Sequence, residues 1–196
     1  MNFKALIEEF LNGFKGDNPN YVICNKADCE KEKELKLNQK GIYNEDSLKF
    51  ELGIFLREKL DNDYVVEFER NVQCFGLDKS QTVKKELDIV VFNKNLKEKY
   101  SIELKFPRVD NDGHTVELIR FEEDEQCVNA LSGLDFKSAY ALIMTDDPLY
   151  IQKSSSKKGR PPKEENKSRW AKYRADNFWE DLQGQTKYHL YEPEGK

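Results

Sequence analysis

The sequence has no long uninterrupted apolar run: no stretch of eighteen apolar residues occurs in its 196 residues. A helix needs a run of about that length to cross a membrane, so we expect no membrane span. The segment MNFKALIEEFLNGF mixes acids with apolar residues, whereas a signal peptide has an unbroken apolar core. These absences predict a cytoplasmic protein that is not bound to a membrane.

Residues that bind zinc are also scarce. The chain has four cysteines and two histidines, it lacks a C-x-x-C pair, and His114 and His189 are isolated from each other. A structural zinc site needs four such ligands at short spacings, so the pattern argues against one. The cysteines are predicted to be unpaired thiols.

An excess of positive charge is lacking as well, since the net charge is −5, and this argues against a general nucleic-acid binder. The average conceals an asymmetry. Residues 153 to 174 contain nine Lys or Arg and two Glu, a local charge of +7, which leaves −12 for the other 174 residues. A basic segment on an acidic body can steer a polyanion to one place.

The apolar content of 38%, with twelve Phe, nine Tyr and two Trp, predicts a folded core. Periodicity predicts an α+β fold whose helices cover 2–15, 45–60, 117–131 and 169–182 and whose strands cover 64–74, 86–93, 99–106, 138–145 and 186–192, with Asn44 as the N-cap of the second helix. Residues 26–37 are predicted to be a short exposed helix or a loop, and 152–168 a flexible loop. We expect a single domain over 1–196.

The segment YSIELKFPR places Glu103 and Lys105 on the same face of a predicted strand. The preceding strand, ELDIVVFN, contains Asp88, with Leu87, Ile89 and Val91 on the opposite face. A polar turn between the two strands predicts an antiparallel hairpin, which would bring Asp88, Glu103 and Lys105 onto one face of the sheet. The alternative is a solvated sheet surface with a weak ion pair.

A shared face has a chemical consequence. Two carboxylates about 4 Å apart repel by about 4 kcal/mol at an effective dielectric constant near 20. A lysine offsets part of this repulsion, and a divalent cation offsets more. Carboxylate oxygens suit Mg²⁺ or Mn²⁺, which take one or two protein carboxylates and fill the other positions with water and phosphate.

The predicted helix over 45–60 offers a further acid. Glu51 lies three residues after Leu48 and four before Phe55, on the edge of the predicted buried stripe. A buried acid without a partner is costly, so Glu51 is expected to approach the same cation directly or through water. Glu45 also lies near this stripe and is the alternative position.

Taken together, Glu51 on a helix, Asp88 on a strand and Glu103-Leu104-Lys105 on the next strand resemble the PD-(D/E)xK nuclease superfamily. The resemblance covers about residues 44–146 and implies a restriction-endonuclease-like αβββαβ core, with a central mixed sheet between helices. Leu87 stands where the family name has a proline.

The resemblance implies a role for each matched residue. Asp88, Glu103 and the backbone carbonyl of Leu104 would hold Mg²⁺, with Mn²⁺ as a substitute, and Glu51 would be an auxiliary ligand. Lys105 would position the attacking water or help to deprotonate it. Gln126, on the next helix, resembles an auxiliary polar position near the site.

The segment KKGRPPK, residues 157–163, resembles the AT-hook, which inserts an arginine into the narrow minor groove of A·T-rich DNA. The alternatives are nonspecific phosphate contact and a solvated linker. The helix over 169–182 interleaves basic residues with aromatic rings that either pack in the core or stack on bases. The residues expected to contact DNA are Lys157, Lys158, Arg160, Lys163 and Arg169.

These features predict a Mg²⁺-dependent DNA endonuclease of restriction, mobile-element or defence type. A catalytically silent nuclease fold that binds DNA or joins a complex is the alternative, and an interaction protein with a solvated Glu-x-Lys face is a third reading. One such site per chain cuts both strands of DNA only through a homodimer or by sequential nicking. The sequence leaves open the target and the choice between DNA and RNA.

Overall fold

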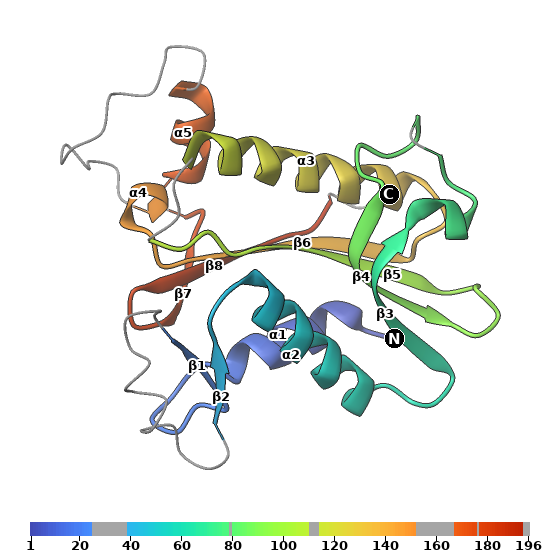
Figure 1. The fold of residues 1–196 in the computed structure, drawn as a ribbon, viewed down its shortest axis with the longest axis horizontal. Coiled ribbons are helices and arrows are strands. Elements are labelled where there is room, and N and C mark those ends of the chain that lie inside the picture. The colour runs from blue at the N-terminus through green and yellow to red at the C-terminus, as the bar shows by residue number, and fades with distance from the viewer. Residues whose placement is uncertain (25–38, 79, 110–113, 152–166, 176, 194–196) are drawn as a thin grey trace.

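The structure is a computed structural model that describes residues 1–24, 39–78, 80–109, 114–151, 167–175 and 177–193. Its centre is a six-stranded mixed sheet with the strand order β3-β4-β5-β6-β8-β7 (Figure 1). The strands are β3 (Tyr64–Asn71), β4 (Glu86–Asn93), β5 (Lys99–Lys105), β6 (Ser138–Thr145), β7 (Glu180–Gln183) and β8 (Thr186–Tyr191). A short 3-10 helix, η3 (Val72–Phe75), follows β3.

The sheet contains both antiparallel and parallel strand pairs. Strands β3, β4 and β5 form an antiparallel meander, which confirms the predicted hairpin of β4 and β5. Strands β5 and β6 are parallel and are joined by a crossover through helix α3 (His114–Gly133). Strand β8 then pairs antiparallel with β6. The predicted mixture of helices and sheet is thus confirmed as a mixed sheet flanked by helices.

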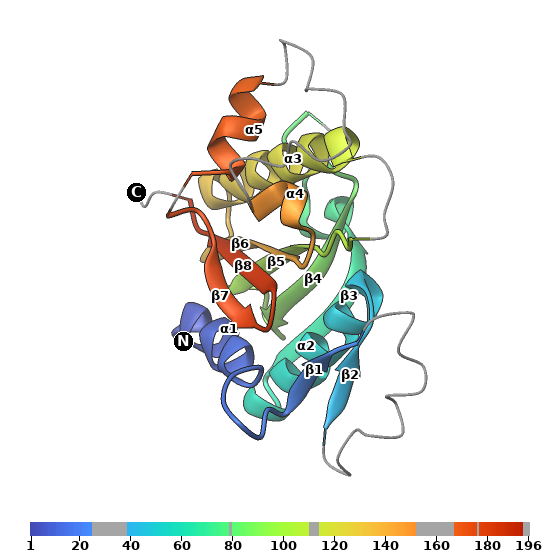
Figure 2. The same cartoon turned by 90° about the vertical axis from the view of Figure 1, so that its left-hand side faces the viewer.

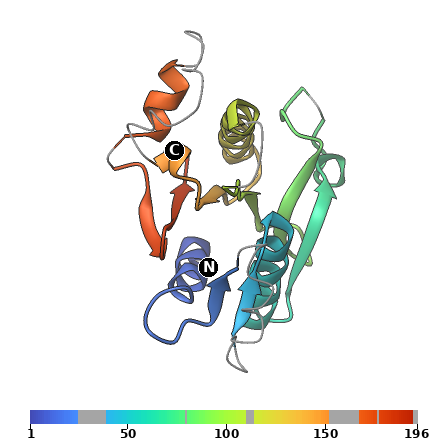
Figure 3. The same cartoon turned by 60° about the vertical axis from the view of Figure 1, so that its left-hand side comes forward.

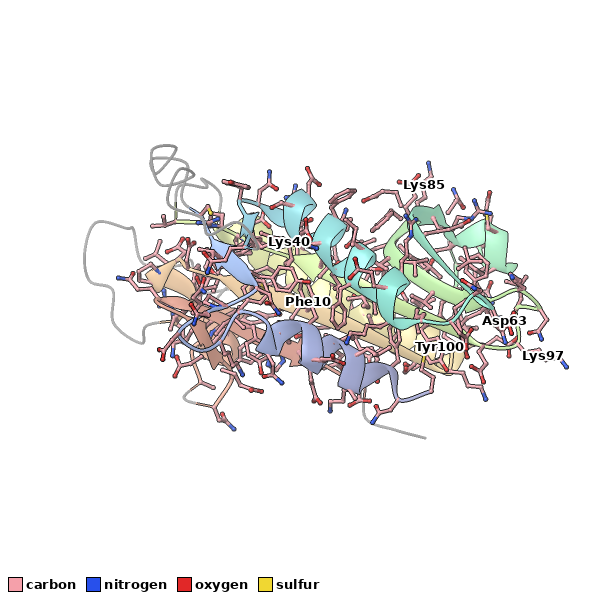
Figure 4. The ribbon with its side chains drawn as sticks, turned by 90° about the horizontal axis from the view of Figure 1, so that it is seen from below. Phe10, Lys40, Asp63, Lys85, Lys97 and Tyr100 are labelled. Atoms are coloured by element: carbon pink, nitrogen blue, oxygen red, sulfur yellow. The ribbon has the colours of Figure 1, made fainter. Side chains whose placement is uncertain are left out.

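Helices cover both faces of the sheet (Figures 1 and 3). Helix α3 packs on one face, against β5 and β6. Helices α1 (Phe3–Asn12) and α2 (Glu45–Lys59) pack together on the other face, and Figure 4 shows Phe10 of α1 in this layer. The large core cluster joins the two helices to the inward side chains of the sheet.

Helix α2 begins where the sequence predicts. The Asn44 side chain accepts a hydrogen bond from the Ser47 backbone N–H, and the Ser47 hydroxyl accepts one from the Asn44 backbone N–H. This reciprocal capping satisfies two backbone donors that the helix itself leaves unpaired. Beside α2 lies a small parallel sheet of β1 (Tyr21–Ile23) and β2 (Lys40–Ile42), which is clear in Figure 2.

The predicted helix over 169–182 is wrong in its second half. Helix α5 (Lys167–Tyr173) ends early, and residues 180–183 form β7, which pairs with β8 at the sheet edge. Leu182 enters the main core, and the Trp179 indole N–H donates to the carbonyls of Tyr150 and Tyr173. Tertiary packing therefore overrides the helical periodicity here.

The predicted alternation along β4 is also wrong at one residue. Ile89 and Val91 pack toward α1 and α2, whereas Leu87 packs on the α3 side of the sheet. The ladder between β3 and β4 is interrupted at the same place, since Phe68 pairs with Ile89 and Arg70 with Leu87 while Glu69, opposite Asp88, has a positive φ of 51°. The change of face therefore coincides with Asp88, a residue of the candidate site.

The other elements contain no predicted site residue. Helix α4 (Pro148–Ile151) is a single turn, and Tyr150 within it packs with Trp170 and Tyr173 between α3 and α5.

In the described part of the chain, no helix is long and apolar enough to cross a membrane. Cys74 and Cys127 are free thiols, as predicted, and Cys29 lies outside the described residues.

Candidate active site

Asp88 and Glu103 lie side by side at the end of the β4–β5 hairpin. Ile89 pairs with Ile102, and Asp88 and Glu103 come directly after this pair on the two strands. Both carboxylates contact the same ammonium group, that of Lys84. The Leu104 backbone N–H donates to Asp88 Oδ2 at 2.9 Å, which fixes the Asp88 carboxylate between the two strands. Glu103 is fully buried and Asp88 is 7% exposed. The alternative of a solvated sheet face is therefore wrong.

Lys105 lies beside this pair. Its ammonium donates to the Leu104 carbonyl at 2.8 Å and to Glu45 Oε1 at 3.2 Å, and it lies 3.8 Å from Asp124 Oδ2. Glu45 stands in the first turn of α2, and its other oxygen accepts the Phe106 backbone N–H at 3.2 Å. Glu45 thus connects the start of α2 to the end of β5.

Glu51 does not lie at this cluster. Its Oε2 is 2.9 Å from the ammonium of Lys40 on β2, and Lys40 is labelled beside α2 in Figure 4. Glu45 and Glu51 are six residues apart, which rotates them by about 240° around a helix of 3.6 residues per turn. Only one of them can face β5. The structure places the alternative acid, Glu45, at the site, and this corrects the predicted role of Glu51.

Three further charged residues, Lys49, Lys84 and Asp124, join the cluster and were not among the predicted site residues. Lys84 forms a close ion pair with Glu103 and donates to Asp124 Oδ1 at 2.7 Å. The Lys49 ammonium lies 3.2 Å from Asp88 Oδ1 and also pairs with Glu69. The cluster therefore has four carboxyl groups and three ammonium groups: Glu45, Asp88, Glu103, Asp124, Lys49, Lys84 and Lys105.

A signal for Asp124 was present in the sequence. The predicted helix over 117–131 buries Phe121 and Val128, and Asp124 lies three residues after the first and four before the second. An acid on a buried stripe needs a partner, which is the same argument that selected Glu51. Gln126, in contrast, is exposed on α3, so the structure points to Asp124 as the helix residue at the site.

Burial and charge act in opposite directions on these groups. Burial raises the pKa of Glu103 and raises that of Asp124 to about 6, and the nearby Lys84 reduces both increases. For Asp88, burial is outweighed by Lys84, by the Leu104 N–H and by the other lysines, so its pKa is lowered. Neighbouring carboxylates outweigh burial at Lys84 and Lys105 and raise the pKa of both ammonium groups.

Whether a divalent cation fits can be judged from the donor atoms. Glu103 Oε1 and Asp124 Oδ2 are buried and have no hydrogen-bond partner among the described residues. Within that same part of the chain, no three His, Cys, Asp or Glu side chains are already arranged as a metal site. Mg²⁺ needs only one or two carboxylates, and the Asp88–Glu103 pair with the Leu104 carbonyl meets that need.

Most of the residues predicted to contact DNA lie outside the part of the chain that the structure describes. Lys157, Lys158, Arg160 and Lys163 lie outside the described residues, and Arg169 is described only as part of the α5 backbone. Of the aromatic rings in the predicted helix over 169–182, Trp170 and Tyr173 are buried in a cluster with Phe121 and Tyr150. Core packing, one of the two predicted uses of these rings, is therefore confirmed for Trp170 and Tyr173.

The chain matches no known family model, no curated protein and no solved structure.

Proposed function

We propose that this protein is a Mg²⁺-dependent DNA endonuclease with the core of the PD-(D/E)xK superfamily. The observation that carries the proposal is the buried pair of Asp88 and Glu103 on two adjacent strands, with Lys105 two residues after Glu103. The element order α2, β3, β4, β5, α3, β6 supports it, because this is the αβββαβ order implied by the resemblance.

In this proposal Asp88, Glu103 and the Leu104 carbonyl would hold the cation. When bound, Mg²⁺ lowers the pKa of water and offsets negative charge on the phosphate. The chain's own contribution is rigidity, since the hydrogen bond from the Leu104 N–H holds the Asp88 carboxylate in place. Burial of both carboxylates strengthens their interaction with any positive charge that enters.

Lys105 acts as a donor and a counter-charge in this proposal. Its raised pKa keeps the ammonium protonated at neutral pH, so water positioning and phosphate neutralisation fit it better than proton abstraction. Glu45 orients it through the 3.2 Å contact. In the reaction, the water oxygen forms a bond to phosphorus and the bond to the leaving sugar oxygen breaks. The attacking water loses a proton to solvent, and the leaving sugar oxygen takes up a proton from solvent to become a hydroxyl group.

The proposal is tested by incubating long single- and double-stranded DNA with the protein in Mg²⁺, Mn²⁺ or EDTA. Asp88→Asn, Glu103→Gln and Lys105→Met should each lower the metal-dependent cleavage rate by about a hundredfold or more. The matched controls, Asp63→Asn and Lys97→Met, remove the same charges from exposed positions (Figure 4) and should cut at the parent rate.

A second candidate, a catalytically silent DNA-binding or complex-forming module, is favoured by one observation. Lys49, Lys84 and Lys105 already partner the carboxylates, so the cluster can be stable without metal. That protein would bind DNA in a filter assay but would cut none of the substrates in either metal. Cleavage that survives the three site substitutions would also contradict the nuclease proposal.

A further inference from the structure

Lys84 occupies an unusual position among the charged residues of the site. It belongs to the segment between η3 and β4, and its ammonium contacts carboxylates from three different elements. It forms a close pair with Glu103 on β5, donates to Asp124 on α3 at 2.7 Å and lies 3.7 Å from Asp88 Oδ2 on β4. Its side chain is 23% exposed, so it enters the cluster from the surface.

This ammonium lies between the two carboxylates that would hold a divalent cation. A cation shared by Asp88 and Glu103 would bind their oxygens at about 2.0 to 2.1 Å and would therefore lie close to the Lys84 ammonium, which contacts both carboxylates. The two positive charges would repel each other across a buried site. The Lys84 ammonium and the metal therefore compete for the same carboxylates.

The contacts of the three lysines single out Lys84. Lys49 pairs with Asp88 and with Glu69, which lies outside the proposed metal site, whereas the Lys84 ammonium contacts Asp88, Glu103 and Asp124 together. Glu103 Oε1 still lacks a hydrogen-bond partner among the described residues, so Lys84 satisfies only part of that carboxylate.

Lys84 also has space into which it can move. An open surface pocket of about 610 Å³ is lined by Lys84 itself together with Ser80, Gln81, Thr82, Val83, Lys85 and Ala130. Its own backbone carbonyl accepts a hydrogen bond from the buried Thr82 hydroxyl at 2.8 Å. The backbone can thus stay fixed while the flexible side chain turns away from the carboxylates.

We propose that Lys84 is an internal counter-cation that holds Asp88, Glu103 and Asp124 together in the metal-free protein and leaves when a divalent cation binds. The inference rests on the proposed metal site. Lys84 is a positioning residue in this scheme and takes no part in bond breaking. The raised pKa of its ammonium, which the neighbouring carboxylates cause against the effect of burial, is consistent with a fully charged competitor.

The first test compares Lys84→Met with Lys85→Met. Lys85 is the adjacent lysine, is exposed and is labelled at the surface in Figure 4, so its replacement removes the same charge without touching the carboxylates. By titration calorimetry, Mn²⁺ should bind Lys84→Met at least about tenfold more tightly than the parent protein. The metal-free Lys84→Met protein should melt several degrees lower, because its carboxylates repel each other, and Mn²⁺ should restore this loss.

The second test uses the unchanged protein, so it remains decisive if Lys84→Met does not fold. Amine acetylation followed by mass spectrometry should find Lys84 protected without metal and at least about fivefold more reactive in saturating Mn²⁺. Lys85 should react equally in both conditions. Equal protection of Lys84 with and without bound Mn²⁺ would overturn the inference, as would Mn²⁺ binding to Lys84→Met no tighter than to the parent protein.

These outcomes are separate from those of the nuclease proposal. If the parent protein cuts DNA with Mn²⁺ but Lys84→Met binds Mn²⁺ no more tightly, the nuclease stands and the counter-cation role fails. If Mn²⁺ releases Lys84 but no DNA is cut, the counter-cation role stands and the nuclease fails. If Mn²⁺ binds neither protein, the counter-cation role is overturned.

Discussion

At the scale of single residues, the site depends on which acid of α2 reaches β5. Glu45 contacts both the Lys105 ammonium and the Phe106 backbone N–H, so it holds the end of β5 and the orientation of Lys105 together. Glu51 pairs with Lys40 on the small sheet instead. Both acids are only partly exposed and lie on the same helix, so they form a natural pair for comparison.

We predict that Glu45→Gln lowers the metal-dependent cleavage rate by about tenfold or more, because a neutral amide holds a lysine more weakly than a carboxylate does. Glu51→Gln should leave the rate within about twofold of the parent protein. Single-turnover cleavage with Mn²⁺ measures both, and thermal melting shows whether each variant is folded. A large loss in Glu51→Gln alone would return the auxiliary role to Glu51.

Three residues of the site were predicted from the sequence, and three others were not. Asp88, Glu103 and Lys105 were accessible because strand alternation and one turn are enough to bring them together. Asp124 could have been found from its helical stripe. Lys84 and Lys49 could not, because a long flexible side chain reaches its partner from many backbone positions, and no periodicity marks the one that it adopts.

At the scale of elements, the site depends on the close approach of α2 to β3. Gly53 lies on the buried side of α2, and a methyl group added there would overlap the ring of Phe68 on β3. The same helix supplies Lys49, which pairs with Glu69 on β3 and reaches Asp88. Spacing between these two elements therefore sets the position of a positive charge at the site.

We predict that Gly53→Ala lowers the free energy of unfolding by about 1 to 3 kcal/mol, because the ring must shift in a packed layer. Alanine is otherwise the better helix former by about 1 kcal/mol, so a loss cannot come from helix propensity. Urea unfolding measures the change. Gly133→Ala is the control, since Gly133 closes α3 with open space around it and should be neutral or slightly stabilising. Equal stability of the two variants would contradict the packing argument.

Element prediction succeeded where local pattern and tertiary contact agree. Helix α2 has a capping residue, an apolar stripe and a buried partner layer, and its predicted range of 45–60 differs from the observed Glu45–Lys59 by one residue at its end. Residues 180–183 have helical spacing in the sequence, yet they form β7 by pairing with the edge of β8. A sheet edge cannot be read from local periodicity, because it depends on a strand that comes later in the chain.

At the scale of the whole molecule, charge is distributed unevenly. Residues 153–174 carry +7 against −12 on the rest of the chain. A polyanion approaching such a molecule is repelled by most of it and attracted to one segment. If DNA is the substrate, that segment governs the affinity and its dependence on salt.

We predict that replacing Lys157, Lys158, Arg160 and Lys163 by Gln weakens DNA binding and lowers the slope of log K against log salt by about 2 to 4, since each lost phosphate contact removes about 0.9. The control replaces four exposed lysines elsewhere, at positions 15, 94, 97 and 137, and reaches the same net charge. Fluorescence anisotropy over a salt series measures both proteins.

The same titrations separate the two forms of DNA contact. An AT-hook-like insertion of Arg160 into a narrow minor groove predicts tighter binding to A·T-rich than to G·C-rich duplexes, and Arg160→Lys should abolish this preference, because it depends on the arginine. Nonspecific phosphate contact predicts equal affinity for both duplexes and no effect of Arg160→Lys, because a lysine carries the same charge. If the control protein loses as much of the salt slope as the variant does, net charge alone steers the DNA and the basic segment has no special part in binding.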